Sequence, residues 1–142
     1  MTHQHPFKRP ESVLVVVYTT DLEFLLLNRI KPADHWQSVT GSLEWDELPE
    51  QAAQRELKEE TGIKDTPIYS GRQNTFPILP AWRDRFAPKV TENLEHVFYL
   101  QLPDKTEITL NAAEHSDCFW LPQTQAAEKV FSWTNRDAIL AC

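Results

Sequence analysis

Cysteine, long apolar runs and an excess of positive charge are all missing from this sequence. Only Cys118 and Cys142 occur among its 142 residues, and they form no spacing pattern, so we expect no structural disulfide. No apolar run approaches the roughly 20 residues that span a bilayer. The N-terminal residues also lack the apolar stretch of a signal peptide. These absences predict a cytoplasmic protein with no membrane partner.

The charge balance excludes another class of partner. Asp and Glu number 21 against 14 Lys and Arg, which gives a formal net charge of −7. Long polyanions bind through basic surface, so we expect no nucleic-acid partner. A small phosphorylated substrate that brings its own Mg²⁺ is compatible with this charge. With 142 residues and 41% hydrophobic content, the chain is expected to form one globular domain, residues 1–142.

Short apolar segments and two helical regions alternate along the chain. Strands are expected at residues 12–18, 24–27, 36–39, 66–69, 95–102, 108–110 and 118–121. The first two strands are close enough to form a hairpin. Helices are expected at 49–61, 122–129 and 135–141. Polar and proline-containing segments predict a loop at 28–35 and irregular structure at 73–90. This mixture indicates an α/β or α+β fold.

The predicted helix 49–61 carries the most informative side chains. Pro49 suits its first position and Gly62 a left-handed stop. Glu56, Glu59 and Glu60 stand at i, i+3 and i+4, which places them within an arc of roughly 100°. Carboxylates this close repel one another unless a cation neutralises them, and Mg²⁺ prefers oxygen ligands. A solvated acidic helix face is the simpler alternative for such a glutamate-rich segment.

A longer pattern surrounds these glutamates. Gly41 is followed by Glu47, and then by Arg55-Glu56-Leu57, Glu59-Glu60 and Gly62-Ile63. The pattern resembles the signature of the Nudix hydrolases, which cleave a nucleoside diphosphate linked to another group with the help of Mg²⁺. That resemblance implies an αβα sandwich with a mixed sheet and a loop-helix-loop signature. Asp46, where the family often has Gly, and Leu48, which is no hydroxyl cap, depart from the common form. We expect Glu47 to pair with Arg55 as a scaffold.

Other charged residues are candidates for the same site. Glu114 lies in a polar loop, and the family resemblance implies that a glutamate there completes the metal set or acts as a base; a plain loop carboxylate is the alternative. Glu95, before the strand 95–102, is a second candidate. Arg29 and Lys8 are expected to contact phosphate oxygens, and surface charge is the alternative for each. The five histidines show no ligand spacing and receive no role.

The resemblance extends beyond the signature. The segments 8–10, 36–42, 85–88 and 132–136 are similar to bacterial Nudix enzymes of folate biosynthesis, which remove pyrophosphate from a pterin triphosphate. This implies that Glu56, Glu60 and Glu114 bind Mg²⁺. It also implies contacts between the substrate and Lys8, Arg29, Thr40 and Ser132, with a pocket wall formed by Phe76, Pro77, Ile78 and Leu79. A flat ring favours such apolar and aromatic walls.

The expected reaction is attack of water on a phosphorus of the triphosphate. Metal ions, Mg²⁺ or Mn²⁺, on Glu56, Glu59, Glu60 and Glu114 would neutralise charge, and Glu60 or Glu114 would take the proton. Hydrolysis of nucleoside triphosphates such as dATP is the nearest alternative, and a Nudix-fold binding module without catalysis is a further one. Whether the protein is a monomer or a homodimer is open.

Overall fold

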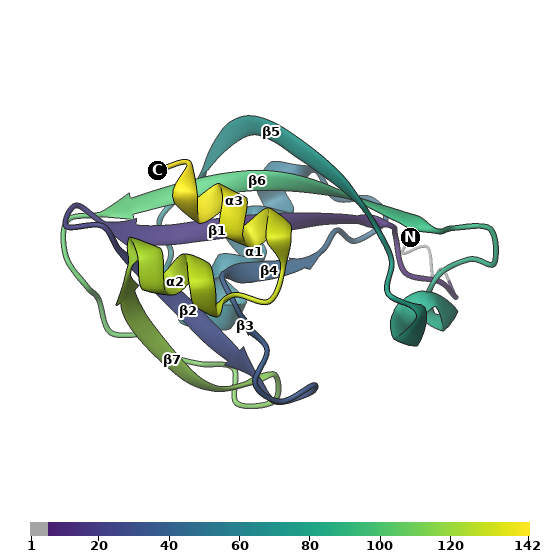
Figure 1. Ribbon diagram of the computed structural model, residues 1–142. Helices are drawn as coiled ribbons and strands as arrows, with labels where there is room; N and C mark the ends of the chain where they lie inside the picture. Colours follow the sequence, from purple (N-terminus) through teal and green to yellow (C-terminus); the bar gives the residue numbers. More distant parts are fainter. Residues whose placement is uncertain (1–5) are drawn as a thin grey trace.

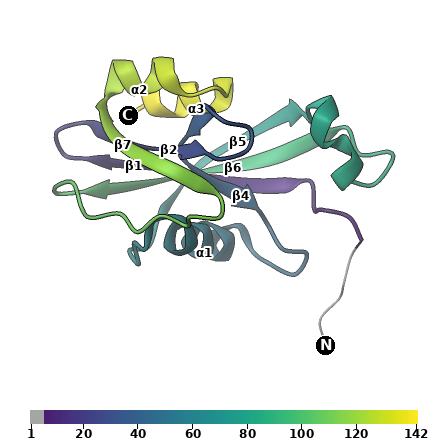
Figure 2. The same cartoon turned by 90° about the horizontal axis from the view of Figure 1, so that it is seen from below.

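The computed structural model describes residues 6–142, which form three layers (Figures 1 and 2). Seven strands in this part of the chain make one mixed sheet: β1 (Glu11–Thr19), β2 (Glu23–Arg29), β3 (Trp36–Gln37), β4 (Val39–Ser42), β5 (Ile68–Pro77), β6 (Glu92–Leu102) and β7 (His115–Pro122). Helix α1 (Pro49–Thr61) covers one face, and α2 (Gln123–Lys129) and α3 (Trp133–Leu140) cover the other. A 3₁₀ helix, η1 (Pro80–Arg85), follows β5. No helix in residues 6–142 is long and apolar enough to cross a membrane.

The central strand β1 organises both hydrophobic cores. It pairs in parallel with β6 and antiparallel with β2 and β4. Its odd-numbered side chains, Val13, Val15 and Val17, pack with residues of α1, whereas Leu14 and Val16 pack with residues of α2 and α3. A strand buried on both faces needs apolar residues at every position, and this is why residues 13–17 form a continuous apolar run.

Helix α1 has the bounds that the sequence predicts. Pro49 takes the first position, and Gly62 adopts φ 79° and donates its N–H to the carbonyl oxygen of Lys58 at 2.9 Å. Leu48 offers no capping side chain. The Leu48 N–H donates to Oε1 of Gln51 at 2.9 Å, which is the half of a capping box that does not depend on a hydroxyl at the cap position.

Two predictions about the middle of the chain are wrong. Residues 73–77, expected to be irregular, belong to β5, whose residues Gln73–Pro77 pair with β6 after a register shift. Most of β5 is exposed, so its sequence carries no apolar period, and the pairing with β6 decides its structure. Residues 108–110, expected to be a strand, form no ladder. Ile108 and Leu110 pack against the core beside α1, and Thr109 donates its N–H to the carbonyl oxygen of Thr61.

Helix α3 is tied to the sheet by one buried amide. Asn135, only 1% exposed, accepts a hydrogen bond from the backbone N–H of Ser38 and donates one to the Ser38 hydroxyl, both at 2.9 Å. Ser132 caps the helix by accepting from the Asn135 N–H at 3.3 Å. These bonds fix the N-terminal end of α3 over the junction of β3 and β4.

We expect Asn135→Ala to destabilise the protein by about 2 kcal/mol, because the buried Ser38 N–H loses its acceptor. Chemical denaturation with a linear extrapolation measures this change. Arg136→Ala, on the exposed side of the same helix, serves as the control and should stay within about 0.5 kcal/mol of the wild type. Equal stability of the two variants would contradict the anchoring role.

Candidate functional site

Helix α1 presents two buried glutamates to the loops at one end of the sheet. Glu60 is 1% exposed and Glu56 is 8% exposed, whereas Glu59 points outward and is exposed. Glu56 packs directly against the backbone of Gly41 in β4, because a Cβ atom at position 41 would lie 2.2 Å from Cδ of Glu56. The glycine that opens the sequence pattern is therefore required by the close approach of this carboxylate.

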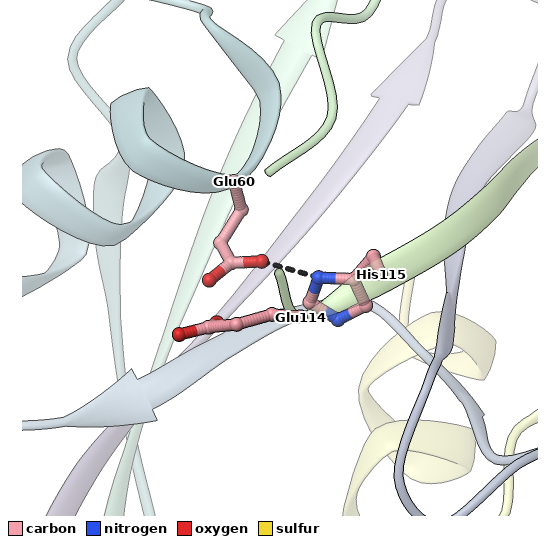
Figure 3. A group of neighbouring side chains, drawn as sticks. All are labelled: Glu60, Glu114 and His115. Carbon is pink, nitrogen blue, oxygen red and sulfur yellow. Dashed lines mark ion pairs between the residues drawn. The ribbon is translucent and has the colours of Figure 1, made fainter. Parts of the chain in front are cut away.

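Glu60 meets two residues that are distant in sequence. Oε2 of Glu60 lies 2.5 Å from Nδ1 of His115, and the Glu114 carboxylate lies beside them (Figure 3). Ligand atoms of these three residues all lie within 4.8 Å of one another. Glu114 and His115 are brought there by β7, which pairs with β2, and the Ile30 N–H donates to the Glu114 carbonyl oxygen at 2.9 Å.

The protonation of these carboxyls reflects their crowding. Burial raises the pKa of Glu60, but hydrogen bonding to His115 and Glu114 outweighs burial and holds it below its usual value. The hydrogen bond with Glu60 raises the pKa of Glu114 to about 7. Burial also raises the pKa of Glu56 to about 7, although the Arg55 guanidinium opposes this shift. The hydrogen bond between Glu60 and Glu114 thus favours the ionised form of Glu60 and the protonated form of Glu114.

This group of residues fits a divalent cation. Two of its members offer carboxylate oxygens, which hard cations prefer, and these converge although Glu60 disfavours the ionised form of Glu114. Glu60 belongs to the last turn of α1, where the helix dipole is also unfavourable for negative charge. His115 either adds a nitrogen ligand or orients Glu60. Glu56 lies one turn earlier on the same side of α1, and Glu59 lies at the exposed edge.

The predicted pair of Arg55 and Glu47 forms the scaffold of the loop that precedes α1. Nε and Nη2 of Arg55 donate to both carboxylate oxygens of Glu47, at 2.7 and 2.8 Å, and Nη1 donates to Oε1 of Glu56 at 2.8 Å. The hydrogen bond to Glu47 raises the pKa of Arg55 further above its usual range. Nη1 of Arg9 donates to the carbonyl oxygens of Glu44, Trp45 and Glu47. The loop is therefore braced around Asp46 without the usual glycine.

Three cationic side chains gather next to the carboxylates. Desolvation, Arg85 and Arg29 lower the pKa of Lys8, and the nearby Glu56 and Glu114 oppose this. Desolvation and Arg85 likewise lower the pKa of Arg29, whose guanidinium lies 5.3 Å from the ring centre of Trp82. These cations repel one another, and they lie beside carboxylates that fit a metal ion. They are therefore suited to bind an anionic ligand such as a phosphate chain.

The remaining predicted substrate contacts lie mainly on the other side of the sheet. Thr40 and Phe76 are half-buried and share the sheet face covered by α3, where Ser132 caps that helix. Ile78 is buried, while Pro77 and Leu79 are exposed between β5 and η1. Glu95, Val97 and Tyr99 are alternate residues of β6, so their side chains point to the same face of the sheet. Val97 and Tyr99 pack on the side of α2 and α3. The structure therefore does not bring Glu95 to the carboxylates of α1.

Two residues of this site carry no assignment from the sequence. His115, one of the histidines without ligand spacing, lies against Glu60, and its only sequence signal is its position next to Glu114. Arg85 joins Lys8 and Arg29 through η1, and the Lys8 N–H donates to its carbonyl oxygen at 2.8 Å. Of the other histidines, His3 and His5 lie outside the described residues.

Known proteins resemble this chain over nearly its full length. The family model of the NUDIX domain matches residues 8–142. Dihydroneopterin triphosphate diphosphatase of Escherichia coli K12 is 44% identical over 139 residues, which cover 94% of this chain and 91% of that protein. The Haemophilus influenzae protein of the same name is 37% identical over 94% of this chain and 87% of its own. The solved structure of the E. coli dihydroneopterin triphosphate pyrophosphohydrolase superposes with a TM-score of 0.89 at 43% identity, covering 96% of this chain and 97% of that one. This match confirms the predicted αβα fold.

The metal-free protein should become less stable as pH rises, and Glu56→Gln should remove part of that loss. Burial raises the pKa of Glu56 to about 7 in the folded protein from its ordinary value of 4.5, so the native state holds the proton more tightly. Its contribution to stability is therefore present below pH 4.5 and lost between pH 4.5 and 7. At pH 8 without metal, we expect a Tm about 5 °C higher for Glu56→Gln than for the wild type, and nearly equal values at pH 4.5.

Differential scanning fluorimetry with EDTA and with Mg²⁺ measures these differences. Mg²⁺ should raise the Tm of the wild type more than that of Glu56→Gln, because the variant lacks one ligand charge. Glu128→Gln, an exposed carboxylate on α2 at the opposite face of the sheet, is the control and should not change the Tm of the metal-free protein. A lower Tm for metal-free Glu56→Gln at pH 8 would contradict the assignment of a destabilising buried carboxylate.

Proposed function

This chain belongs to the NUDIX family, and on that basis we propose that it hydrolyses dihydroneopterin triphosphate to dihydroneopterin monophosphate and pyrophosphate. The observation that carries the proposal is the likeness to the E. coli and H. influenzae enzymes, which spans nearly the whole of both chains. The converging carboxylates and cations support a triphosphate as the substrate. The bond that breaks lies between the α- and β-phosphates, because the products are a monophosphate and pyrophosphate.

The cofactor in this proposal is Mg²⁺, with Mn²⁺ as a substitute. Glu56, Glu60 and Glu114 hold the ion, with Glu59 at the exposed edge of the site. His115 fixes the orientation of Glu60 through the 2.5 Å contact between Nδ1 and Oε2. When bound, the ion neutralises charge on the phosphate oxygens.

The protein side chains divide the remaining work between phosphate binding and proton transfer. Lys8, Arg29 and Arg85 hold the phosphate oxygens, with the Arg guanidinium groups able to grip two oxygens each. A water attacks phosphorus, and a carboxylate takes its proton. Glu114 is exposed, whereas Glu60 is buried against His115, so Glu114 is better placed to reach that water.

The nearest alternative is a hydrolase of nucleoside triphosphates such as dATP, since phosphate contacts are common to both substrates. A binding module without catalysis is disfavoured, because Glu56, Glu59 and Glu60 are all present in α1 and Glu114 joins them from the loop before β7. Discrimination between these substrates therefore has to come from recognition of the ring. A wrong ring would leave polar groups of the protein without hydrogen-bond partners.

Pyrophosphate release with Mg²⁺ tests the substrate directly. We expect kcat/KM for dihydroneopterin triphosphate to exceed the values for dATP and dGTP by about 10-fold or more, since a buried hydrogen-bonding edge discriminates by at least that factor. A ratio to dATP at or below one would remove the pterin substrate and leave a general nucleotide hydrolase. Absence of any Mg²⁺-dependent release would remove catalysis altogether.

Removing the charge of either central carboxylate should abolish most turnover. Glu60→Gln keeps the shape of the side chain but not its charge, and Glu114→Ala removes the proton acceptor, so kcat should fall by about 10² to 10⁴ for each. The fold should persist, as judged by circular dichroism and Tm. Glu50→Gln, in the exposed first turn of α1, is the control and should keep wild-type kcat. Near-wild-type turnover of both variants at saturating Mg²⁺ would refute the assignment.

A further inference from the structure

A row of polar side chains crosses the sheet face beneath α3, where an apolar core would be expected. The strand registers place Asn74 of β5 opposite Glu95 of β6, Glu95 beside Ser12 of β1, and Ser12 opposite Ser42 of β4. Side chains that are paired across neighbouring strands point to the same face. Farther along the same face, Leu14, Val16 and Val97 form the apolar core with α2 and α3. The polar row is therefore confined to one end of the sheet, and Glu95 lies near the start of α3, where Thr134 is its neighbour.

Glu95 is the exceptional member of this row. It is 5% exposed, and its Oε1 atom has no hydrogen-bond partner among the described residues. Burial raises its pKa, and side-chain hydrogen bonds with Thr134 and Asn74 oppose that shift only in part. A buried carboxylate oxygen without a donor destabilises the fold, and groups of this kind often have a functional explanation.

The polar neighbours of Glu95 already have partners of their own. The Asn93 amide donates to the Ser12 hydroxyl at 2.8 Å, and Asn135 is bonded to Ser38 through both ends of its amide. The Ser132 and Thr134 hydroxyls lie 2.8 Å apart, within hydrogen-bond distance of each other. Glu95 is thus left with acceptor capacity that the surrounding side chains do not fill.

A ligand that matches this carboxylate has two N–H donors side by side in one plane. The 2-amino-4-oxopyrimidine half of a pterin offers such an edge, with a ring N–H next to an amino group, and guanine offers the same pair. Adenine lacks it, and hypoxanthine has the ring N–H without the amino group. Two parallel N–H···O bonds to one carboxylate give both strength and discrimination.

We propose that Glu95 is the specificity-determining residue that binds the ring N–H and 2-amino group of the pterin. This inference rests on the proposed function. Phe76, which pairs with Asn93, and the half-buried Thr40 border the polar row, so the row meets solvent at this end of the sheet. Thr40 shares the face of Glu95, and the next residue, Gly41, packs against Glu56. Strand β4 therefore links the ring-binding side with the carboxylates that serve the triphosphate.

The test compares wild type, Glu95→Gln and the control Glu92→Gln, an exposed position on the same strand. The substrates are dihydroneopterin triphosphate, dGTP, dITP and dATP, with pyrophosphate release as the assay. In glutamine, an amide NH₂ donor replaces one of the two carboxylate oxygens. This donor would face the N–H donors of the ligand. In Glu95→Gln, kcat/KM for the pterin and for dGTP should fall about 10- to 100-fold, mainly through KM. The values for dITP should fall less, and those for dATP should stay nearly unchanged.

A second measurement separates recognition from turnover and folding. Free neopterin, which has no phosphate, can be titrated into each variant without metal and followed by its fluorescence. Its Kd should rise about 10- to 100-fold in Glu95→Gln and stay unchanged in Glu92→Gln. The Tm of the free Glu95→Gln variant should equal or exceed that of the wild type, because a buried charge with one unpaired oxygen is removed.

The outcomes distinguish this inference from the proposed function. If the wild type prefers dihydroneopterin triphosphate and Glu95→Gln keeps both that preference and the neopterin Kd, Glu95 has no role in recognition while the function stands. If Glu95→Gln loses activity on all four substrates equally and its Tm falls, its role is structural and the inference is overturned. If the wild type shows no preference for the pterin over dATP, the proposed function and this inference fall together.

Discussion

Burial of two carboxylates on one side of α1 is the constraint around which the rest of the site is arranged. Glu56 and Glu60 are both buried, and burial, with a smaller contribution from the neighbouring glutamates, raises the pKa of Glu56 to about 7. The last turn of the helix adds an unfavourable dipole. Such an arrangement costs stability in the metal-free protein and becomes favourable when a divalent cation is present.

The surrounding residues limit that cost without removing it. Arg55 bonds to Glu56 while its other donors hold Glu47, so one guanidinium joins the helix to its preceding loop. His115 contacts Glu60, and Gly41 leaves the space that Glu56 occupies. Lys8, Arg29 and Arg85 add positive charge but also repel one another. The site is thus prepared for a cation and an anion together, as an Mg²⁺-bound triphosphate would provide.

The sheet divides the proposed substrate between two environments. The carboxylates and cations at α1 would serve the triphosphate, which every nucleotide shares, so they give affinity with little selectivity. The face beneath α3 holds Glu95, whose oxygen lacks a donor in the described residues, and discrimination between rings would arise there. Adjacent residues of β4, Thr40 and Gly41, face these two environments, so a small movement of this short strand would affect both.

Local sequence was sufficient to predict the elements whose structure depends on residues that are neighbours in the chain. The bounds of α1 followed from Pro49, Gly62 and the helix formers between them, and the buried β1 followed from its continuous apolar run. The spacing of Glu56 and Glu60 placed both on the buried side of α1 because helical geometry is periodic, while Glu59 lies at the exposed edge. The pairing of Arg55 with Glu47 was also predicted correctly.

By contrast, β5 depends on hydrogen bonds to β6, and no local pattern records a partner strand. His115 reaches Glu60 only because β7 pairs with β2, and Arg85 joins Lys8 only through the turn of η1. The alternation of side chains along β6 decides that Glu95 faces α3. The sequence alone therefore determined the helix, the central strand and the position of the glutamates on α1. Tertiary structure decided which distant side chains meet them, because strand pairing and register bring together residues whose separation along the chain carries no signal.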